Sequence, residues 1–562
     1  MTVLQSVHRH RKTRPAIAAA LGLALLPGLL AQKSMYDPPV ATPGGLNPRP
    51  YLMSIIRTQG VANVTWTGIH GPYQLLQKTN LSDTAWQAVG ETTTNTSAQV
   101  PLQDGNAFLA VTGGDDNYVG VQFCRVCHKT TNAHWTNTIH ATALQALKNI
   151  HQDKNPACVG CHTVGFGFEG GYQDETSTAF LENVQCENCH GPGGRHISDF
   201  EDPSLRPVVS ISAAICGGCH TDAHHPTYDE WKDSLHAEVN EHVRSGFANS
   251  DGTPNTGRMM QCGVCHSGAV RVALINQAES DSPEPTLPTA EDAAKYGITC
   301  AVCHDAHSPG PGPGGEVEQT RYPTYSLDNY SYASSSALGS FVPQYNPNIQ
   351  VCGQCHNMRG AKWTDTSRPP HHSPQYNMLI GQGGYDLGVS KIMTHGLETE
   401  DQCASCHVYA YDVAKPTEED PNYKGHTFLP TYGACVDCHG SAEGAQAFAE
   451  STKTNIVNRI NEVVGLLNSW ATNKAPEALR TKYGALAWEY NIAGTLGNPT
   501  GDSTIKGPTS TEQADVPDAI KQARMNLYLV EYDGSFGVHN GDYAKWLINV
   551  AKTNVITELA KP

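Results

Sequence analysis

The sequence predicts a mainly α-helical protein with many irregular loops, preceded by a small β-sandwich-like module and followed by a separate helical domain. Three observations predict this order. Residues 51–114 contain no cysteine, and short β-prone runs alternate there with turn residues. All 18 cysteines lie between Cys124 and Cys438. After His439 the apolar residues recur at the spacing of amphipathic helices.

The first 31 residues have the composition of a secretory signal peptide. The cations Arg9, Arg11, Lys12 and Arg14 precede an apolar run over residues 16–31 that is too short to span a bilayer. We expect cleavage near Ala31 and export to the periplasm or the cell surface. Later apolar stretches are shorter than a membrane span, so the mature chain is expected to be soluble.

Residues 32–50 are rich in proline and are expected to form an extended lead-in. The β module that follows is predicted from runs at residues 64–66, 73–75, 86–89 and 108–111, which are separated by turn residues. We see no catalytic constellation in this module. Its expected role is packing or docking.

The cysteines leave little freedom of interpretation, because every one belongs to a Cys-x-x-Cys-His unit. There are nine such units, numbered here as motifs 1 to 9 in chain order. They are Cys124/Cys127/His128, Cys158/Cys161/His162, Cys186/Cys189/His190, Cys216/Cys219/His220, Cys262/Cys265/His266, Cys300/Cys303/His304, Cys352/Cys355/His356, Cys403/Cys406/His407 and Cys435/Cys438/His439.

Each motif is typical of covalent attachment of haem c. The two thiols, one helical turn apart, each add to a vinyl group of the porphyrin, and the imidazole of the histidine binds the iron as proximal ligand. A zinc site, a redox dithiol or a disulfide framework would not require a histidine after every second cysteine. We therefore expect nine covalently attached haems, which supply much of the buried apolar surface of a multihaem cytochrome c fold.

The region after His439 is predicted to be a helical domain. Apolar residues follow helical spacing over 456–470 and again over 479–490, and two further helices are expected over 516–531 and 541–559. The expected organisation is a signal peptide (1–31), the lead-in and β module (32–115), a first haem region with motifs 1 to 5 (116–275), a second with motifs 6 to 9 (276–440), and the helical domain (441–562).

An internal repeat organises the haem regions. Motif 1 is followed by Trp135 and His140, and motif 4 by Trp231 and His236, in the shared pattern Trp-x-x-[Thr/Ser]-x-His-Ala. The residues around motifs 3 and 6 also match. Motifs 1 to 3 and 4 to 6 therefore look like a duplicated triplet whose haems should superpose, with each Trp/His pair on a helical turn.

The Trp-x-x-[Thr/Ser]-x-His-Ala pattern and residues 186–196 resemble the cytochrome c-554 family, which is related to hydroxylamine oxidoreductase and pentahaem nitrite reductase. The resemblance covers residues 118–310. Residues 369–375, 403–409 and 425–428 are more similar to nitrite-reductase-related multihaem proteins, as are the C-terminal helices with residues 537–540.

The resemblance implies second, distal iron ligands, and the 26 histidines are enough to supply one for each haem. By likeness to the family pattern, the best candidates are His140, His196, His236, His307, His372 and His426. The next candidates are His225, His395 and His134. His539 is expected either to bind an iron or to hydrogen-bond a haem propionate.

The distal ligands decide between two functions. An iron with histidines on both faces suits electron transfer, whereas an open face can bind nitrite, hydroxylamine or a similar small molecule. We favour an electron carrier with no catalytic residues. The alternative is an oxidoreductase of small nitrogen or sulfur compounds, similar to nitrite reductase or hydroxylamine oxidoreductase, with one open haem.

The formal net charge of −17 argues against nucleic acid as a partner, because a strongly acidic chain repels phosphate backbones. Expected partners are redox proteins, among them other cytochromes or further copies of this chain in a surface complex.

Overall fold

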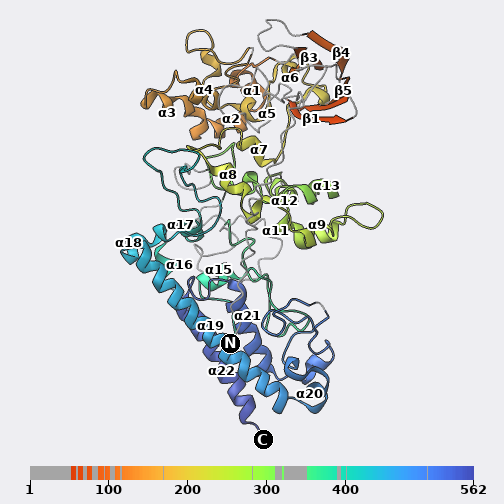
Figure 1. Cartoon of the computed structure of the whole chain (residues 1–562), viewed down its shortest axis with the longest axis vertical. Coiled ribbons are helices and arrows are strands. Elements are labelled where there is room, and N and C mark those ends of the chain that lie inside the picture. The colour runs from red at the N-terminus through yellow and green to blue at the C-terminus, as the bar shows by residue number, and fades with distance from the viewer. Residues whose placement is uncertain are drawn as a thin grey trace, which may run out of the picture. The chain divides into compact units, whose positions relative to one another are not determined.

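A computed structural model describes the six N-terminal strands, residues 117–309, 319–321 and 351–562, apart from breaks at 169, 281–282, 386, 389–393, 400 and 503. The predicted signal peptide and lead-in lie outside these residues. The chain divides into one unit that contains the strands and a second that contains the residues from 116 onward. Figure 1 colours both units by residue number.

The N-terminal unit consists of two three-stranded antiparallel sheets, with strand orders β1-β2-β5 and β4-β3-β6. Ala62, Val64 and Trp66 alternate with less buried residues along β2 and face Tyr73 and Val111 in a small apolar core. The predicted β-sandwich-like module is thus confirmed. Its strands are β1 (Leu52–Thr58), β2 (Val61–Trp66), β3 (Tyr73–Lys78), β4 (Gln87–Thr93), β5 (Ser97–Pro101) and β6 (Phe108–Gly113).

The central region has short helices joined by irregular segments, and the longest of those described has 13 residues. They are α1 (Val121–Cys127), α2 (Lys129–Trp135), α3 (Ala143–Asn149), α4 (Pro156–His162), α5 (Cys186–His190), α6 (Gly194–Ser198), α7 (Ala213–Cys216), α8 (Thr227–Lys232), α9 (Glu241–Arg244), α10 (Thr256–Arg258), α11 (Val264–His266), α12 (Gly268–Ser280), α13 (Ala290–Lys295), α14 (Cys300–Cys303), α15 (Gln375–Leu379), α16 (Thr394–Glu398), α17 (Cys403–His407) and α18 (Val436–His439). Tighter turns are η1 (Ile139–Thr142), η2 (Ala179–Leu181), η3 (Pro203–Leu205), η4 (Leu235–Ala237) and η7 (Tyr432–Cys435), and η5 (Met259–Gly263) is a π-helical turn.

The C-terminal residues form the predicted helical domain. Its elements are α19 (Ala442–Asn473), α20 (Glu477–Tyr483), η8 (Gly484–Leu486), η9 (Glu512–Asp515), α21 (Asp518–Asp533) and α22 (Gly541–Ala560). Helices α19, α21 and α22 lie side by side (Figure 1) and bury Ile460, Leu467, Tyr528 and Leu547 between them. This cluster is the largest apolar core described in the chain.

Two sequence predictions about helices need correction. The spacing over 479–490 suggests one helix, but α20 ends at Tyr483 because Gly484 adopts a positive φ of 53°. The Trp/His pairs do not share one helical turn either. Trp135 ends α2 while His140 lies in η1, and Trp231 lies in α8 while His236 lies in η4.

Among the described residues, no helix is both long and apolar enough to cross a membrane.

Candidate haem sites

The attachment motifs lie in short helices or turns, which place their two thiols one turn apart. Motifs 1, 2, 3 and 8 lie within α1, α4, α5 and α17, each with its histidine in the helix or just after it. Asn155 shows how one such turn begins, since its side chain accepts a hydrogen bond from the Ala157 N–H, 3.1 Å away, before Pro156.

Seven of the nine proximal imidazoles face a second imidazole at a nearly constant distance. The ring centres are 5.9 to 6.2 Å apart in every case. The pairs, with the proximal histidine first, are His190 and His307, His220 and His140, His266 and His371, His304 and His426, His356 and His236, His407 and His539, and His439 and His395.

This distance fits two ligands on opposite faces of one iron. A ligating imidazole nitrogen lies about 2 Å from the metal, and the ring centre about 1 Å further, so two such rings should have centres about 6 Å apart. Large apolar side chains are exposed beside the pairs, including Ile139 next to His140 and Leu235, 97% exposed, next to His236. A porphyrin would cover apolar surface of this kind.

His128, the predicted proximal ligand of motif 1, differs from the paired imidazoles. It follows α1 directly, and no second histidine ring faces it among the described residues. Its exposure is shared by His220, His356 and His439, which do have ring partners. Helix α1 buries none of its residues, and both His128 and the Cys127 side chain are exposed. A haem attached at this motif would supply that cover itself.

The surroundings of His128 still connect motif 1 with motif 3. His128 lies close enough to His190 to contribute to lowering the pKa of that ring, although burial is the largest cause. The backbone N–H of His128 donates to the carbonyl oxygen of Cys124 at 2.9 Å, which keeps the ring one turn beyond the first thiol. His128 as an iron ligand therefore stays a prediction.

The other predicted distal histidines are placed as follows. His225 lies close enough to His162 for that ring to contribute to lowering its pKa, after the larger effect of burial. His196 lies on α6 with a buried Nδ1 that has no hydrogen-bond partner among the described residues. His134 is exposed on α2. His372 packs on the ring of Tyr532, with ring centres 3.8 Å apart.

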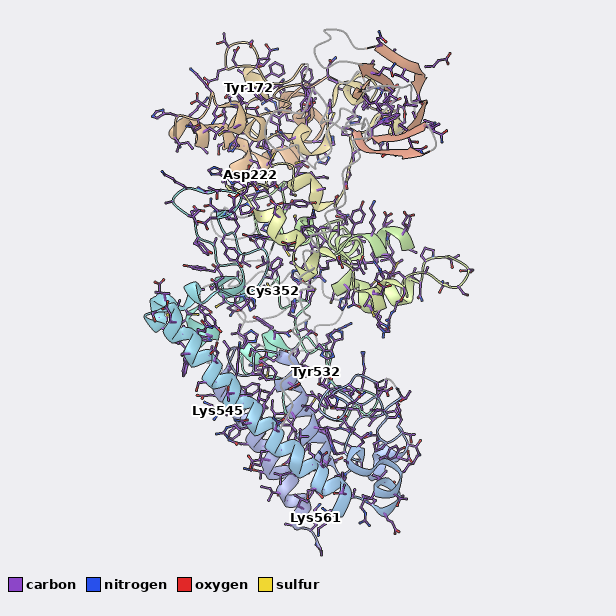
Figure 2. The ribbon with its side chains drawn as sticks, viewed as in Figure 1. Tyr172, Asp222, Cys352, Tyr532, Lys545 and Lys561 are labelled. Carbon is purple, nitrogen blue, oxygen red and sulfur yellow. The ribbon has the colours of Figure 1, made fainter. Side chains whose placement is uncertain are left out.

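Two paired histidines were not among the favoured candidates. His371 rather than its neighbour His372 faces His266, and two consecutive histidines give no sequence signal that would distinguish them. His539 faces His407 from the loop between α21 and α22 of the helical domain. Tyr532, labelled in Figure 2, lies near the end of α21 that leads into this loop.

Several of the paired imidazoles are oriented by a neutral acceptor at Nδ1. The acceptor is a backbone carbonyl oxygen for His190 (Val208, 2.6 Å), His407 (Phe428, 2.9 Å), His426 (Lys424, 2.9 Å) and His395 (Val538, 2.9 Å), and also for His162 (Ala143, 2.7 Å). A proton held on Nδ1 leaves the Nε2 lone pair for a metal.

Desolvation favours the neutral form of these imidazoles, which is the form that binds iron. It lowers the pKa of His220 to about 4, with a smaller contribution from His140. Burial likewise lowers the pKa of His236 to about 4, assisted by His356. Both pKa values lie well below that of free imidazole, so these two rings are neutral at pH 7.

Thiols of different motifs touch one another. The sulfur atoms of five pairs lie side by side, namely Cys124 and Cys186, Cys161 and Cys219, Cys216 and Cys300, Cys265 and Cys355, and Cys352 and Cys403. Three further pairs are close neighbours, namely Cys189 and Cys216, Cys303 and Cys352, and Cys406 and Cys435. In each pair burial raises the pKa of the first thiol, and the second thiol adds a smaller contribution in the same direction. Figure 2 labels Cys352 in the central region.

These contacts place the motifs in the spatial order 1-3-4-6-7-8-9, with motif 2 beside motif 4 and motif 5 beside motif 7. The contacts 1–3, 3–4 and 2–4 recur three motifs later as 4–6, 6–7 and 5–7.

The sequence repeat also extends to hydrogen bonds. The indole N–H of Trp135 donates to the carbonyl oxygen of Val184 (3.2 Å), and that of Trp231 donates to the carbonyl oxygen of Ile298 (2.8 Å). The superposition of haem triplets stays a prediction.

Two buried carboxylates hold the segments that carry the motifs. Glu187 accepts hydrogen bonds from the backbone N–H groups of Val119, Gly120 and Gly193. Glu230, on α8, accepts from the N–H groups of Lys424 and His426, each 2.7 Å away. Burial raises the pKa of Glu230, and these two hydrogen bonds act in the opposite direction.

Comparisons with known proteins agree with this site. The family described as cytochrome c554 and c-prime matches residues 123–191 and 351–440. Cytochrome c-554 of Nitrosomonas europaea is 38% identical over 96 residues, which are 14% of this chain and 40% of that protein. The chain therefore matches less than half the length of this curated relative.

Among solved structures, the outer cell wall cytochrome OcwA is similar over 78% of this chain and 99% of its own, with a TM-score of 0.50 and 18% identity. An undecaheme cytochrome from the S-layer of Carboxydothermus ferrireducens aligns over 91% of this chain and 62% of its own, with a TM-score of 0.41 and 16% identity.

The motifs, the imidazole pairs and these matches define the class: the chain is a multihaem c-type cytochrome with covalently bound haem c. Within this class, its motif-bearing segments are similar to cytochrome c554, and its overall fold is similar to that of OcwA. The fold class predicted from the sequence is thereby confirmed.

Proposed function

We propose that the chain binds nine haems and carries electrons along a row of seven, attached at motifs 1, 3, 4, 6, 7, 8 and 9. The haems of motifs 2 and 5 are side branches that join this row at motifs 4 and 7. Each haem, when bound, supplies a site that takes up and releases one electron. The chain contributes the order of these sites through the contacts between its thiols.

The observation that carries this proposal is the set of seven imidazole pairs. A histidine on each face closes the coordination of the iron, so such a haem exchanges electrons without binding a substrate. In this assignment His371, rather than His372, is the distal ligand at motif 5, and His539 is the distal ligand at motif 8. The other five distal ligands are those proposed from the sequence.

The repeat supports His225 as distal ligand at motif 2. Motif 5 takes its partner His371 from the segment after motif 7, two motifs further along the chain. The equivalent position for motif 2 is the segment after motif 4, where His225 lies near His162. For motif 1 we retain His128 as the proximal ligand and His196 as the distal one, because the Nδ1 of His196 is buried.

We propose that the protein works outside the cytoplasm, in the periplasm or at the cell surface, and exchanges electrons with other redox proteins. The predicted signal peptide supports this location, and the name of the structural relative OcwA places that protein in the outer cell wall. Export also suits haem attachment, which takes place outside the cytoplasm for c-type cytochromes.

The proposal is tested on the mature holoprotein. Mass spectrometry should show nine covalent haems on a chain that lacks about 31 residues, as the signal-peptide pattern predicts. Its ferric spectrum should be that of low-spin haem. Six haems or fewer would contradict the motif assignment, and a high-spin component would favour the oxidoreductase alternative, in which one haem has an open face.

A further inference from the structure

The imidazole of His539 differs from the carbonyl-bonded histidines in what its Nδ1 meets. Its partner is a carboxylate oxygen, Oδ1 of Asp533, at 2.6 Å, and the side chain of Asp533 is completely buried. A second carboxylate contact, at His307, is longer, since Oδ1 of Asp305 is 3.5 Å from Nδ1 of His307, and the Asp305 side chain is 24% exposed.

The fold holds the Asp533 carboxylate in place from several sides. Asp533 is the last residue of α21, and Gly534 follows it with a left-handed φ of 73°. The hydroxyl of Ser535 donates a hydrogen bond to Oδ2 of Asp533, and its oxygen accepts one from the backbone N–H of His539 at 3.1 Å. Asn540 then caps α22, so both ends of the loop are anchored in helices.

We propose that Asp533 makes the haem of motif 8 the low-potential position of the row. This inference rests on the proposed function, in which His407 and His539 bind that iron. A carboxylate that accepts the Nδ1 proton increases the basicity of the imidazole. A more basic ligand stabilises the more positively charged ferric iron, and burial limits the screening of the carboxylate by solvent.

The position of motif 8 gives this difference a functional consequence. Its thiols touch or approach those of motifs 7 and 9, so it is the last but one position of the row. An electron that travels between motif 7 and motif 9 must occupy it. A low-potential site there is an energetic step near one end of the path, and it controls the rate at which electrons pass that end.

Two variants of the holoprotein should shift one potential in opposite directions. Asp533→Asn keeps a hydrogen-bond acceptor but removes the charge, so one of the nine reduction steps should move to higher potential. A tenfold change in the ferrous-to-ferric ratio corresponds to ~59 mV, and we expect at least this. Ser535→Ala removes a donor from the carboxylate, which increases its charge at Oδ1, so the same step should move to lower potential.

Two control variants test the role of charge and distance. Ser373→Ala removes a neutral acceptor 3.1 Å from Nδ1 of His371, and it should move a potential less than Asp533→Asn does. Asp305→Asn removes the longer and more exposed carboxylate contact and should give an intermediate shift. The measurement is a spectroscopic redox titration in which all variants contain the full number of haems.

One more variant, at His539 itself, separates this inference from the proposed function. His539→Ala should turn one haem high-spin. If it leaves every haem low-spin, the ligand assignment at motif 8 is wrong. If it gives one high-spin haem, while Asp533→Asn and Ser535→Ala leave all nine potentials in place, the ligand assignment stands and the role of Asp533 is refuted. Should Asp533→Asn fail to fold, the downward shift in Ser535→Ala decides.

Discussion

Replacing His426 with alanine tests the pairing of distant histidines directly. The ring of His426 faces that of His304 with ring centres 6.2 Å apart, and its Nδ1 lies 2.9 Å from the carbonyl oxygen of Lys424. We expect the haem of motif 6 to change from low-spin to high-spin in the variant. Its covalent attachment through Cys300 and Cys303 should remain, because neither thiol is altered.

The magnitude follows from the surroundings of His426. One haem of nine loses a ligand, so about one ninth of the low-spin signal should be converted. The backbone stays in place, since the N–H groups of Lys424 and His426 still donate to Glu230. Loss of the side-chain hydrogen bond costs about 1 kcal/mol, which is small against the stability of a typical domain.

The assay is a ferric absorption and electron paramagnetic resonance spectrum of the purified holoprotein. Added imidazole should occupy the vacated position and restore the low-spin signal. The matched control is His242→Ala, which removes an exposed histidine on α9 and should leave the spectrum unchanged. An unaltered spectrum in His426→Ala would show that a remote histidine had been mistaken for an iron ligand.

Four further variants test how the protein is held together. Trp231→Phe removes the indole donor to Ile298 O and should cost about 1 kcal/mol in thermal unfolding, as should Trp135→Phe in the other repeat; no loss in either would deny these bonds a structural role. Glu187→Ala leaves three backbone N–H groups without their acceptor, so amide exchange over residues 119–127 should accelerate, and unchanged exchange would contradict this. Burial raises the pKa of Glu489 to about 7, so the folded state holds a proton that the unfolded state releases near pH 4.5. The contribution of Glu489 to stability should therefore fall as the pH rises from about 4.5 to about 7. Over that interval Glu489→Gln should gain stability relative to the wild type. A constant difference between the two melting temperatures would refute the raised pKa of Glu489.

The attachment motifs could be predicted from the sequence because they are local. Two thiols and an imidazole within five residues need only one helical turn to reach one porphyrin, and the surrounding fold adds little to that geometry. The exposure of His128 could not be predicted in this way, because it depends on which segments pack over α1.

The helices of the C-terminal domain were predictable, since periodic apolar residues such as Ile460 and Leu467 describe a buried face whatever packs against it. The end of α20 was missed because Gly484 terminates a helix whose apolar spacing continues.

The second ligand of each iron depends on contacts between remote parts of the chain. His140 follows motif 1 but faces the histidine of motif 4, and His426 faces that of motif 6 from more than a hundred residues away. His371 and His372 are adjacent and chemically identical, yet in the folded chain His372 packs on Tyr532 and His371 faces His266. The order of the motifs in space has the same origin. This order depends on which cysteines the folded chain brings together. The spacing of residues along the sequence describes only local structure, so it cannot show which remote segments become neighbours in the fold.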